Sequence, residues 1–266
     1  MSIHQAHAGT RVAAVAVLIA AIGAGSACQI SFGGVEGRES WTKQYTLATG
    51  GTFELKNTNG RVRIEASADG NTVDVRAEKI AKANDEAAAK EAAKKIEIRE
   101  SASADRVTID SAVNNLGLSM GERRVDYVIR VPHWAKVTID ATNGDIEIRG
   151  VTGFVDVDAT NGRIQATGME HGAKVEATNG QVTLDFAKVA DGDIRCDTTN
   201  GAIYITVPKD AKMRISASVS NGAIQTHDLD LTVVEKSRRR LDATYNGGGA
   251  SVRLETTNGL ISLKGR

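Results

Sequence analysis

Residues 137–166 read VTIDATNGDIEIRGVTGFVDVDATNGRIQA. The tripeptide Thr-Asn-Gly occurs twice in this stretch, and its two asparagines, Asn143 and Asn161, lie 18 positions apart. On both sides of each tripeptide, apolar and polar residues alternate with a period of two, as in VDVD at 155–158. Such alternation is typical of a β-strand that buries one face. The stretch therefore predicts short strands that are separated by Asn-Gly bends.

The same bend recurs along most of the chain. Thr-Asn-Gly stands at six places and Ser-Asn-Gly at one, and the asparagines from Asn143 to Asn221 are spaced 18, 18, 21 and 21. When the copies are aligned on the asparagine, the residue three positions later is Val or Ile in every copy. Glycine supplies the positive φ of a tight bend at low cost, and Asn tolerates it. We assign a structural turn role to Asn59, Gly60, Asn143, Gly144, Asn161, Gly162, Asn179, Gly180, Asn200, Gly201, Asn221, Gly222, Asn258 and Gly259.

Two all-β architectures share this pattern. Asn-Gly between alternating strands is a strong hairpin signal, which would give an antiparallel meander. Near-identical units that cannot bury their apolar face alone usually stack as a solenoid. The nearly fixed period favours the second alternative: a β-solenoid, similar to a single-stranded β-helix, with coils of about 18–21 residues.

One segment breaks the β pattern. Residues 84–95 read NDEAAAKEAAKK, with good N-cap residues at the start, an Ala-rich body and favourable Glu-to-Lys pairs. We predict one short helix there, packed against or beside the first coils. The chain is expected to divide into a signal peptide at 1–27, a linker at 28–40, an N-terminal β region at 41–136 and regular repeats at 137–266.

Two features of the sequence carry a family resemblance. They are the recurrent coil T-N-G-x-[IV]-x-aliphatic and the closing stretch NGGGASVRL at 246–254, which leads into Asn258. Over about residues 41–266 the chain resembles the bacterial "putative adhesin" family of β-strand-repeat proteins, a domain of unknown function. The resemblance implies a surface or envelope protein and brings no catalytic residues.

The N-terminus has the pattern of an export signal. Arg11 precedes a 14-residue apolar run at 12–25, which is too short for a membrane-spanning helix and fits a secretory signal peptide. Cys28 follows the small residues at 25–27 and resembles the acylated Cys of a bacterial lipoprotein, although Gly25 stands where that motif usually has an aliphatic residue. We expect lipid attachment at Cys28 and a membrane partner. Because Gln29 is not Asp, the resemblance to Gram-negative lipoproteins implies the outer membrane. Periplasmic or secreted protein is the alternative.

Composition and motifs exclude several functions. Basic and acidic residues are balanced at 33 each, so no net field attracts nucleic acid. The histidines beyond the signal, His133, His171 and His227, are far apart, and no zinc or phosphate-loop motif occurs. Cys196 falls in a buried column. We expect no metal, no cofactor and no catalysis.

A polar outward face remains as the candidate for function. It carries carboxylates that β-helical polysaccharide-cleaving enzymes could use, but an open, solvated sheet lacks the paired geometry of glycoside hydrolysis; these residues are Asp140, Asp145, Glu147, Asp156 and Asp158. The sequence favours an exported, adhesin-like or scaffolding protein that binds a glycan or a surface protein. An enzyme acting on envelope polysaccharide and a periplasmic partner of an envelope-stress sensor are the alternatives.

Overall fold

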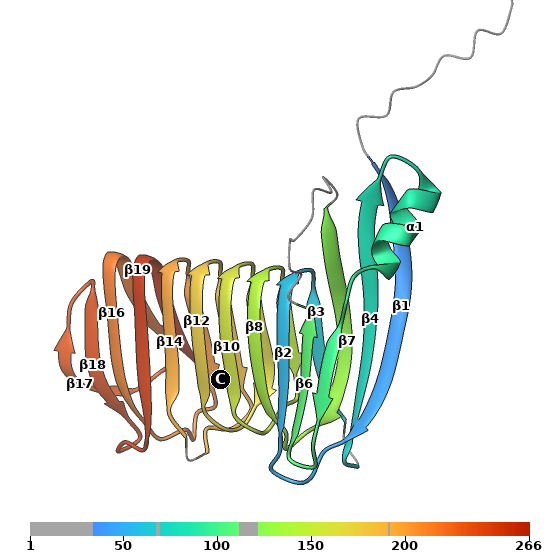
Figure 1. The fold of residues 1–266 in the computed structure, drawn as a ribbon. Coiled ribbons are helices and arrows are strands. Elements are labelled where there is room, and N and C mark those ends of the chain that lie inside the picture. Colours follow the sequence, from blue (N-terminus) through green and yellow to red (C-terminus); the bar gives the residue numbers. More distant parts are fainter. Residues whose placement is uncertain (1–33, 68–69, 112–121, 191) are drawn as a thin grey trace, which may run out of the picture. The chain divides into compact units, whose positions relative to one another are not determined.

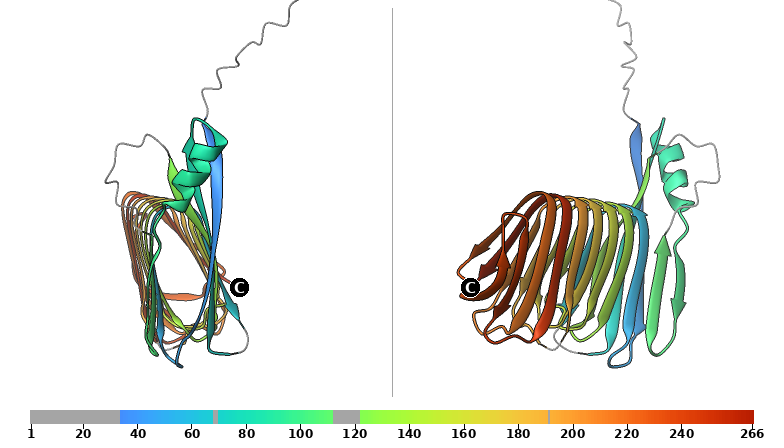
Figure 2. Two further views of the ribbon diagram at one scale, coloured as in Figure 1. Left: turned by 45° about the vertical axis from the view of Figure 1, so that its right-hand side comes forward. Right: turned by 90° about the vertical axis from the view of Figure 1, so that its left-hand side faces the viewer.

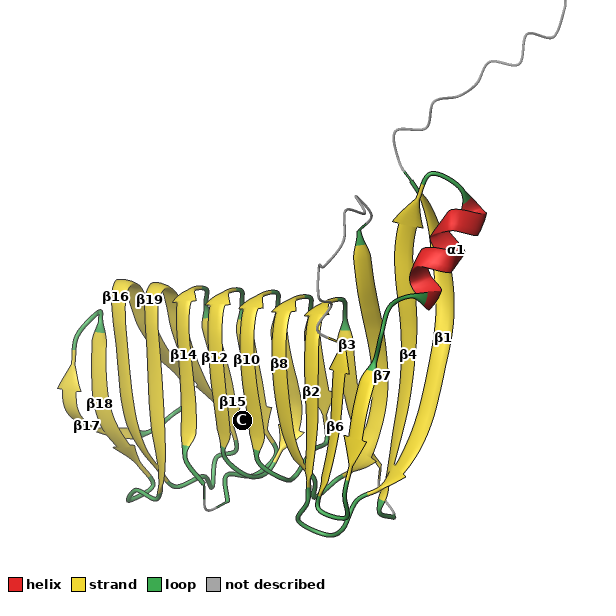
Figure 3. Cartoon of the chain, viewed as in Figure 1, coloured by secondary structure: helices red, strands yellow, loops and turns green. Residues whose placement is uncertain are grey.

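Seven coils of the chain follow one plan in the computed structural model, which describes residues 34–67, 70–111, 122–190 and 192–266. In each coil a strand runs along a first wall, turns at an Asn-Gly bend and continues along a second wall (Figures 1 and 2). The bends form one edge of the stack, and the loops that connect successive coils form the opposite edge (Figure 3). Cys28 and the expected signal peptide lie outside the described residues.

Five coils have a separate strand in each wall, and two are single long strands that cross the bend. The divided coils are β2 (Thr52–Asn59) with β3 (Val62–Ser67), β8 (Lys136–Asn143) with β9 (Ile146–Arg149), β10 (Val155–Asn161) with β11 (Ile164–Met169), β12 (Ala173–Asn179) with β13 (Val182–Phe186), and β14 (Ile194–Asn200) with β15 (Ile203–Val207). The continuous coils are β16 (Met213–His227) and β19 (Ala250–Gly265).

Neighbouring coils pair in parallel and in register. Val157 lies between Ile139 and Val175, and each bend asparagine is level with the next. The two strands that flank a bend pair with strands of adjacent coils and not with each other. The solenoid is therefore confirmed, and the antiparallel meander is excluded for these coils, because the strands find partners in adjacent coils instead of across the turn.

The apolar columns predicted from the asparagine alignment form the core between the walls. Ile146, Ile164 and Val182 are paired neighbours in the second wall, and each is at most 1% exposed. Cys196 continues the first-wall column next to Val175 and is fully buried, as predicted. The outward residues between them face solvent, so each wall has one dry and one wet side.

The order of coils in the stack differs from their order in the chain at both ends. The β19 coil lies between the β14–β15 coil and the β16 coil, although β16 precedes it in sequence. At the other end the β2–β3 coil lies between the β8–β9 coil and the pair β6 (Arg106–Ser111) and β7 (Arg123–Pro132). Each end therefore has one intercalated coil.

Antiparallel strands close both ends of the stack. At the N-terminal end, β1 (Val35–Thr46) pairs with β4 (Thr72–Ala83), which pairs with β7, while β5 (Arg99–Ala102) pairs with β6. Strand β1 already begins within residues 28–40, the expected linker. At the other end, β18 (Arg240–Tyr245) pairs with both β16 and β17 (Leu231–Lys236).

The predicted helix is confirmed as α1 (Glu86–Lys94). The Asp85 carboxylate accepts a hydrogen bond from the Ala88 backbone N–H at 2.8 Å, which caps the first turn. Ala89 is buried where the helix contacts β1 and β4. The contact is close, since a Cβ atom at Gly37 of β1 would lie 2.1 Å from the Ala89 carbonyl carbon.

Close contact between backbones explains the glycines of the bends. A Cβ at Gly162 would lie 2.1 Å from the carbonyl oxygen of Gly144, and Gly162 also has a φ of 133°. Gly201 and Gly259 do not have a positive φ. Even so, a Cβ at Gly201 would lie 1.8 Å from the Gly180 oxygen, and one at Gly259 would lie 2.0 Å from the Gly201 oxygen. The bend asparagines do not adopt positive φ either. The predicted turn chemistry is thus only part of the reason; the larger part is that coils stack glycine on glycine.

We expect Gly162→Ala to lower the free energy of unfolding by about 3 kcal/mol, because overpacking against a rigid backbone adds to the positive-φ strain. Gly247→Ala is the matched control: its φ is 79°, but no atom lies within 4 Å of its Cβ position. That substitution should cost about 1 kcal/mol, the strain alone. Urea denaturation of both variants measures the difference, and equal losses would contradict the stacking role.

Candidate binding surface

The bend asparagines form a continuous side-chain ladder along the edge of the stack. The amide of Asn161 donates to Asn143 at 2.8 Å, and Asn179 donates to Asn161 at 2.9 Å. The other bends continue this row at 2.8–2.9 Å through the pairs Asn143–Asn59, Asn200–Asn179, Asn258–Asn200 and Asn221–Asn258. Because each asparagine side chain is hydrogen-bonded to the next, we assign the ladder to stabilising the stack of coils and not to ligand binding.

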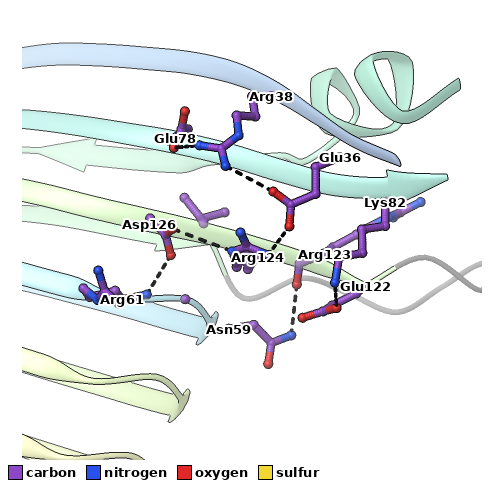
Figure 4. Close-up of polar contacts among 12 residues, drawn as sticks. Glu36, Arg38, Asn59, Arg61, Glu78, Lys82, Glu122, Arg123, Arg124 and Asp126 are labelled. Carbon is purple, nitrogen blue, oxygen red and sulfur yellow. Dashed lines mark hydrogen bonds and ion pairs between the residues drawn. The ribbon is translucent and has the colours of Figure 1, made fainter. Parts of the chain in front are cut away.

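The ladder ends in a network of ion pairs at the N-terminal end (Figure 4). Asn59 donates to the backbone carbonyl of Arg123 at 3.2 Å. Beside it Arg124 bridges Glu36 of β1, at 3.1 Å, and Asp126 of its own strand, at 3.7 Å. The hydrogen bond from Arg124 is the main cause that lowers the pKa of Glu36. These charges are mutually paired, so the network ties strands together and offers no poised catalytic group.

The outer face of the first wall is the larger polar surface. Three outward positions precede each bend, and in-register stacking turns two of them into columns of mostly like residues with the spacing of β-strands, about 4.8 Å. The hydroxyl column contains Thr142, Thr160, Thr178, Thr199, Thr257 and Ser220. The acidic column contains Asp140, Asp158, Glu176, Asp197 and Glu255.

A short basic column accompanies the acidic one. Lys174 lies 3.1 Å from Glu176 in the same strand. Arg195 lies 2.6 Å from Asp197, and Arg253 contacts Glu255 in the same way. The sequence analysis did not identify these cations, although the same asparagine alignment places all three at one position.

A hollow of about 500 Å³ lies over this face of the first wall. Its walls combine the carboxylates, one guanidinium and the hydroxyl column; the lining side chains include Asp158, Glu176, Arg195, Asp197, Glu255, Thr178, Thr199 and Thr257. The hollow is open and polar, and it crosses the coils instead of entering the core. Such a surface can make many hydrogen bonds with an extended ligand.

The carboxylates selected from the sequence do not converge on one site. Asp140 and Asp158 are neighbours in the acidic column. Asp145 instead accepts a hydrogen bond from the Arg163 backbone at the bend, and Glu147 lies in the second wall, paired with Arg63 at 2.9 Å. No two of them flank a cleft as glycoside hydrolysis requires.

The pKa of Asp158, in the acidic column, lies above the usual value of an aspartate. Burial is the main cause that raises this pKa, and the neighbouring carboxylates of Asp140 and Glu176 raise it further. Burial likewise raises the pKa of the Cys196 thiol, which is therefore an inert core group. Within the described ranges no group of three or more His, Cys, Asp or Glu side chains is placed to hold a metal ion.

These features define a class of protein: a β-solenoid whose first wall presents columns of repeated polar side chains. Residues 110–264 match the family described as Toastrack DUF4097, and the chain belongs to this family. The resemblance that the coil repeats indicated is thereby confirmed.

Solved structures with a similar arrangement are of bacterial origin. One is described as a "putative cell adhesion protein" from Clostridium sporogenes ATCC 15579; it is 13% identical, the match covers 86% of this chain and 100% of that chain, and the TM-score is 0.47. Another is a "putative adhesin" from Bacteroides fragilis NCTC 9343, with 10% identity, 86% and 97% coverage and a TM-score of 0.40. No curated protein matches the chain.

We expect Asp158→Asn to raise the free energy of unfolding at pH 7 by about 0.5 kcal/mol, since like charges directly opposite on neighbouring strands are destabilising. A carboxyl whose pKa is raised by folding binds its proton more tightly in the folded state, so stability falls as the pH rises through its titration. The gain should therefore disappear in acid, where Asp158 is protonated. Urea unfolding at pH 7 and at about pH 3 measures both effects.

Asp197→Asn is the matched control for this prediction. Asp197 lies in the same acidic column as Asp158, but it is the ion-pair partner of Arg195. Its substitution should therefore lower the free energy of unfolding slightly at pH 7. A loss of stability in Asp158→Asn at pH 7 would contradict the repulsion.

Proposed function

We propose that this protein is an exported, envelope-associated and non-catalytic adhesin-like protein, which binds a macromolecule through the outer face of its first wall. The observation that carries the proposal is the in-register repetition of hydroxyl, acidic and basic side chains across the coils, with the hollow of about 500 Å³ above them. A glycan or an extended surface protein matches such a surface, because its own groups also recur along its length.

Three features support binding over catalysis. Lys174 and Arg195 are paired with carboxylates of the same strand, so neither the cation nor the carboxylate of each pair is held as a free acid or base. The perturbed carboxyl, Asp158, has only like charges and Lys174 around it. The face is open, whereas general acid catalysis by a carboxyl needs a dry cleft with a raised pKa on one of two partners.

The basic column gives the test of the binding face. We expect purified protein to bind cell-envelope fragments saturably in a sedimentation assay, and Arg195→Glu to weaken this binding at least tenfold, because it reverses the charge of the one cationic side chain that lines the hollow. Arg149→Glu is the matched control: Arg149 is exposed to a similar extent and pairs with Glu147, two positions away in its own strand, but lies on the second wall.

The same assay tests the absence of catalysis. Release of soluble sugar from the fragments would contradict the non-catalytic proposal and favour the polysaccharide enzyme. Equal weakening by Arg195→Glu and Arg149→Glu would contradict the assignment of binding to the first wall.

The export part of the proposal rests on residues outside the described ranges. The apolar run at 12–25 ends in small residues before Cys28, as in a lipoprotein signal. In the part of the chain that the structure describes, no helix has both the length and the apolar character to cross a membrane. We propose that acyl chains on Cys28 hold the protein at the outer membrane.

For this anchor we expect the wild-type protein, expressed in a bacterial host, to fractionate with membranes and to carry added acyl mass. Cys28→Ser should be found in soluble fractions or remain uncleaved, because two or more acyl chains are needed for stable retention. Intact-mass analysis of both proteins distinguishes the cases. A free periplasmic protein with an unmodified Cys28 thiol would contradict the anchor and leave export intact.

A further inference from the structure

A second hollow lies at the edge of the solenoid opposite the Asn-Gly bends, where the first-wall strands begin. Its volume is about 310 Å³, and its side chains come from Trp134, Lys136, Thr152, Phe154 and His171. It shares no lining residue with the hollow over the first wall. In contrast to that polar surface, two aromatic rings contribute to it.

Register explains why the aromatic ring of Phe154 has open space beside it. Val137, Val155 and Ala173 are paired neighbours, so the residues immediately before them, Lys136, Phe154 and Gly172, belong to successive coils. The Phe154 carbonyl accepts from the Val137 N–H at 2.9 Å, which fixes the backbone. Gly172 has no side chain, so nothing projects from the position next to Phe154 in the following coil.

Three glycines keep the floor of this hollow free of side chains. A Cβ at Gly153 would lie 2.2 Å from the Ala135 carbonyl oxygen, and one at Gly172 would lie 2.4 Å from the Asp193 carbonyl oxygen. At Gly192 it would lie 2.7 Å from the Gly172 nitrogen. Close stacking of the loops therefore excludes a side chain at each of these three positions.

The exposure of Phe154 is exceptional in this protein. Aromatic residues make up only 4% of the chain, and Phe53, Tyr127 and Phe186 are almost completely buried. Phe154 is 37% exposed and is the one aromatic residue among the exposed large hydrophobic residues of the described ranges. Trp134 is partly buried against the core, which holds it in place. The core does not require an outward ring at 154, so the ring is available to a ligand.

We infer that this edge pocket binds a sugar ring that carries a carboxylate or phosphate group. An aromatic face is electron-rich and attracts the C–H groups on one face of a pyranose. Lys136 is exposed and has no ion pair within the described residues, so its ammonium is available to an anion. Thr152, whose hydroxyl donates to the His133 carbonyl at 3.2 Å, and His171 complete the polar lining.

The size of the pocket limits the ligand further. Small-molecule sites usually have volumes of about 300–1,000 Å³, so this one is suited to one or two sugar rings and is too small for a strand or helix of a partner. This inference rests on the proposed function and specifies it: the macromolecule is a glycan, and one of its residues, an acidic sugar, enters the edge pocket.

The test uses full-length protein with the substitution Trp41→Phe, which leaves Trp134 as the only tryptophan. Trigalacturonic acid is the acidic probe and galactotriose the neutral one. We expect trigalacturonic acid to change Trp134 fluorescence saturably. Phe154→Ala should weaken the affinity for this probe at least tenfold. Lys136→Gln should reduce the affinity for the acidic probe to that for the neutral probe. Val128→Ala is the matched control, since Val128 is similarly exposed but lies on β7, and it should have no effect.

Three results would overturn the inference: no saturable response at millimolar trigalacturonic acid, equal affinity for both probes, or unchanged affinity in Phe154→Ala. The outcome is separable from that of the proposed function, because Arg195 does not line this pocket. Envelope binding that is sensitive to Arg195→Glu, without any probe response, would retain the proposed function and reject the pocket. A probe response without envelope binding would retain the pocket and reject the proposed function.

Discussion

Contact between the glycine backbones of successive bends sets the spacing of the whole stack. At Gly180 a Cβ would lie 1.8 Å from the Gly162 oxygen, so no other residue allows the coils to approach to strand-pairing distance. The asparagine beside each glycine then links its amide to the next coil. With the bends fixed in this way, each position of one coil faces the same position of the next. The dry apolar columns and the wet polar columns both follow from this single contact.

Much of this fold could be predicted because the repeat is local. Period-two alternation around each Asn-Gly identifies the strands, and alignment on Asn161 places Val157 in the column where the structure has it. The direction of pairing was harder to predict, since a hairpin and a solenoid corner use the same alternation. The choice depends on whether a strand pairs across a two-residue bend or with a coil about 18 residues away, and only the repetition favoured the latter.

The ends of the stack and the edge pocket could not be predicted for different reasons. Leu254 and Ala217 both fit the apolar column next to Cys196, so nothing in either coil shows that the later one is its neighbour. The pocket lies where successive coils are joined, and its side chains come from different positions of the repeat: Lys136 and Phe154 stand seven residues before their asparagines, Trp134 nine and His171 eight. Trp134 and Phe154 therefore fall in no common column, although stacking brings them to one hollow.

The intercalated coils change how the solenoid can open. In a simple stack each terminal coil contacts only its sequence neighbour, so coils can fray from the ends one at a time. Here three of the asparagine pairs join residues 18 or 21 positions apart, but Asn143–Asn59 spans 84 positions, Asn258–Asn200 spans 58 and Asn221–Asn258 spans 37. Removing either intercalated coil breaks two interfaces at once and leaves its outer neighbour without support. Opening of either end therefore separates segments that are distant in the sequence, whereas opening between two middle coils separates neighbouring repeats.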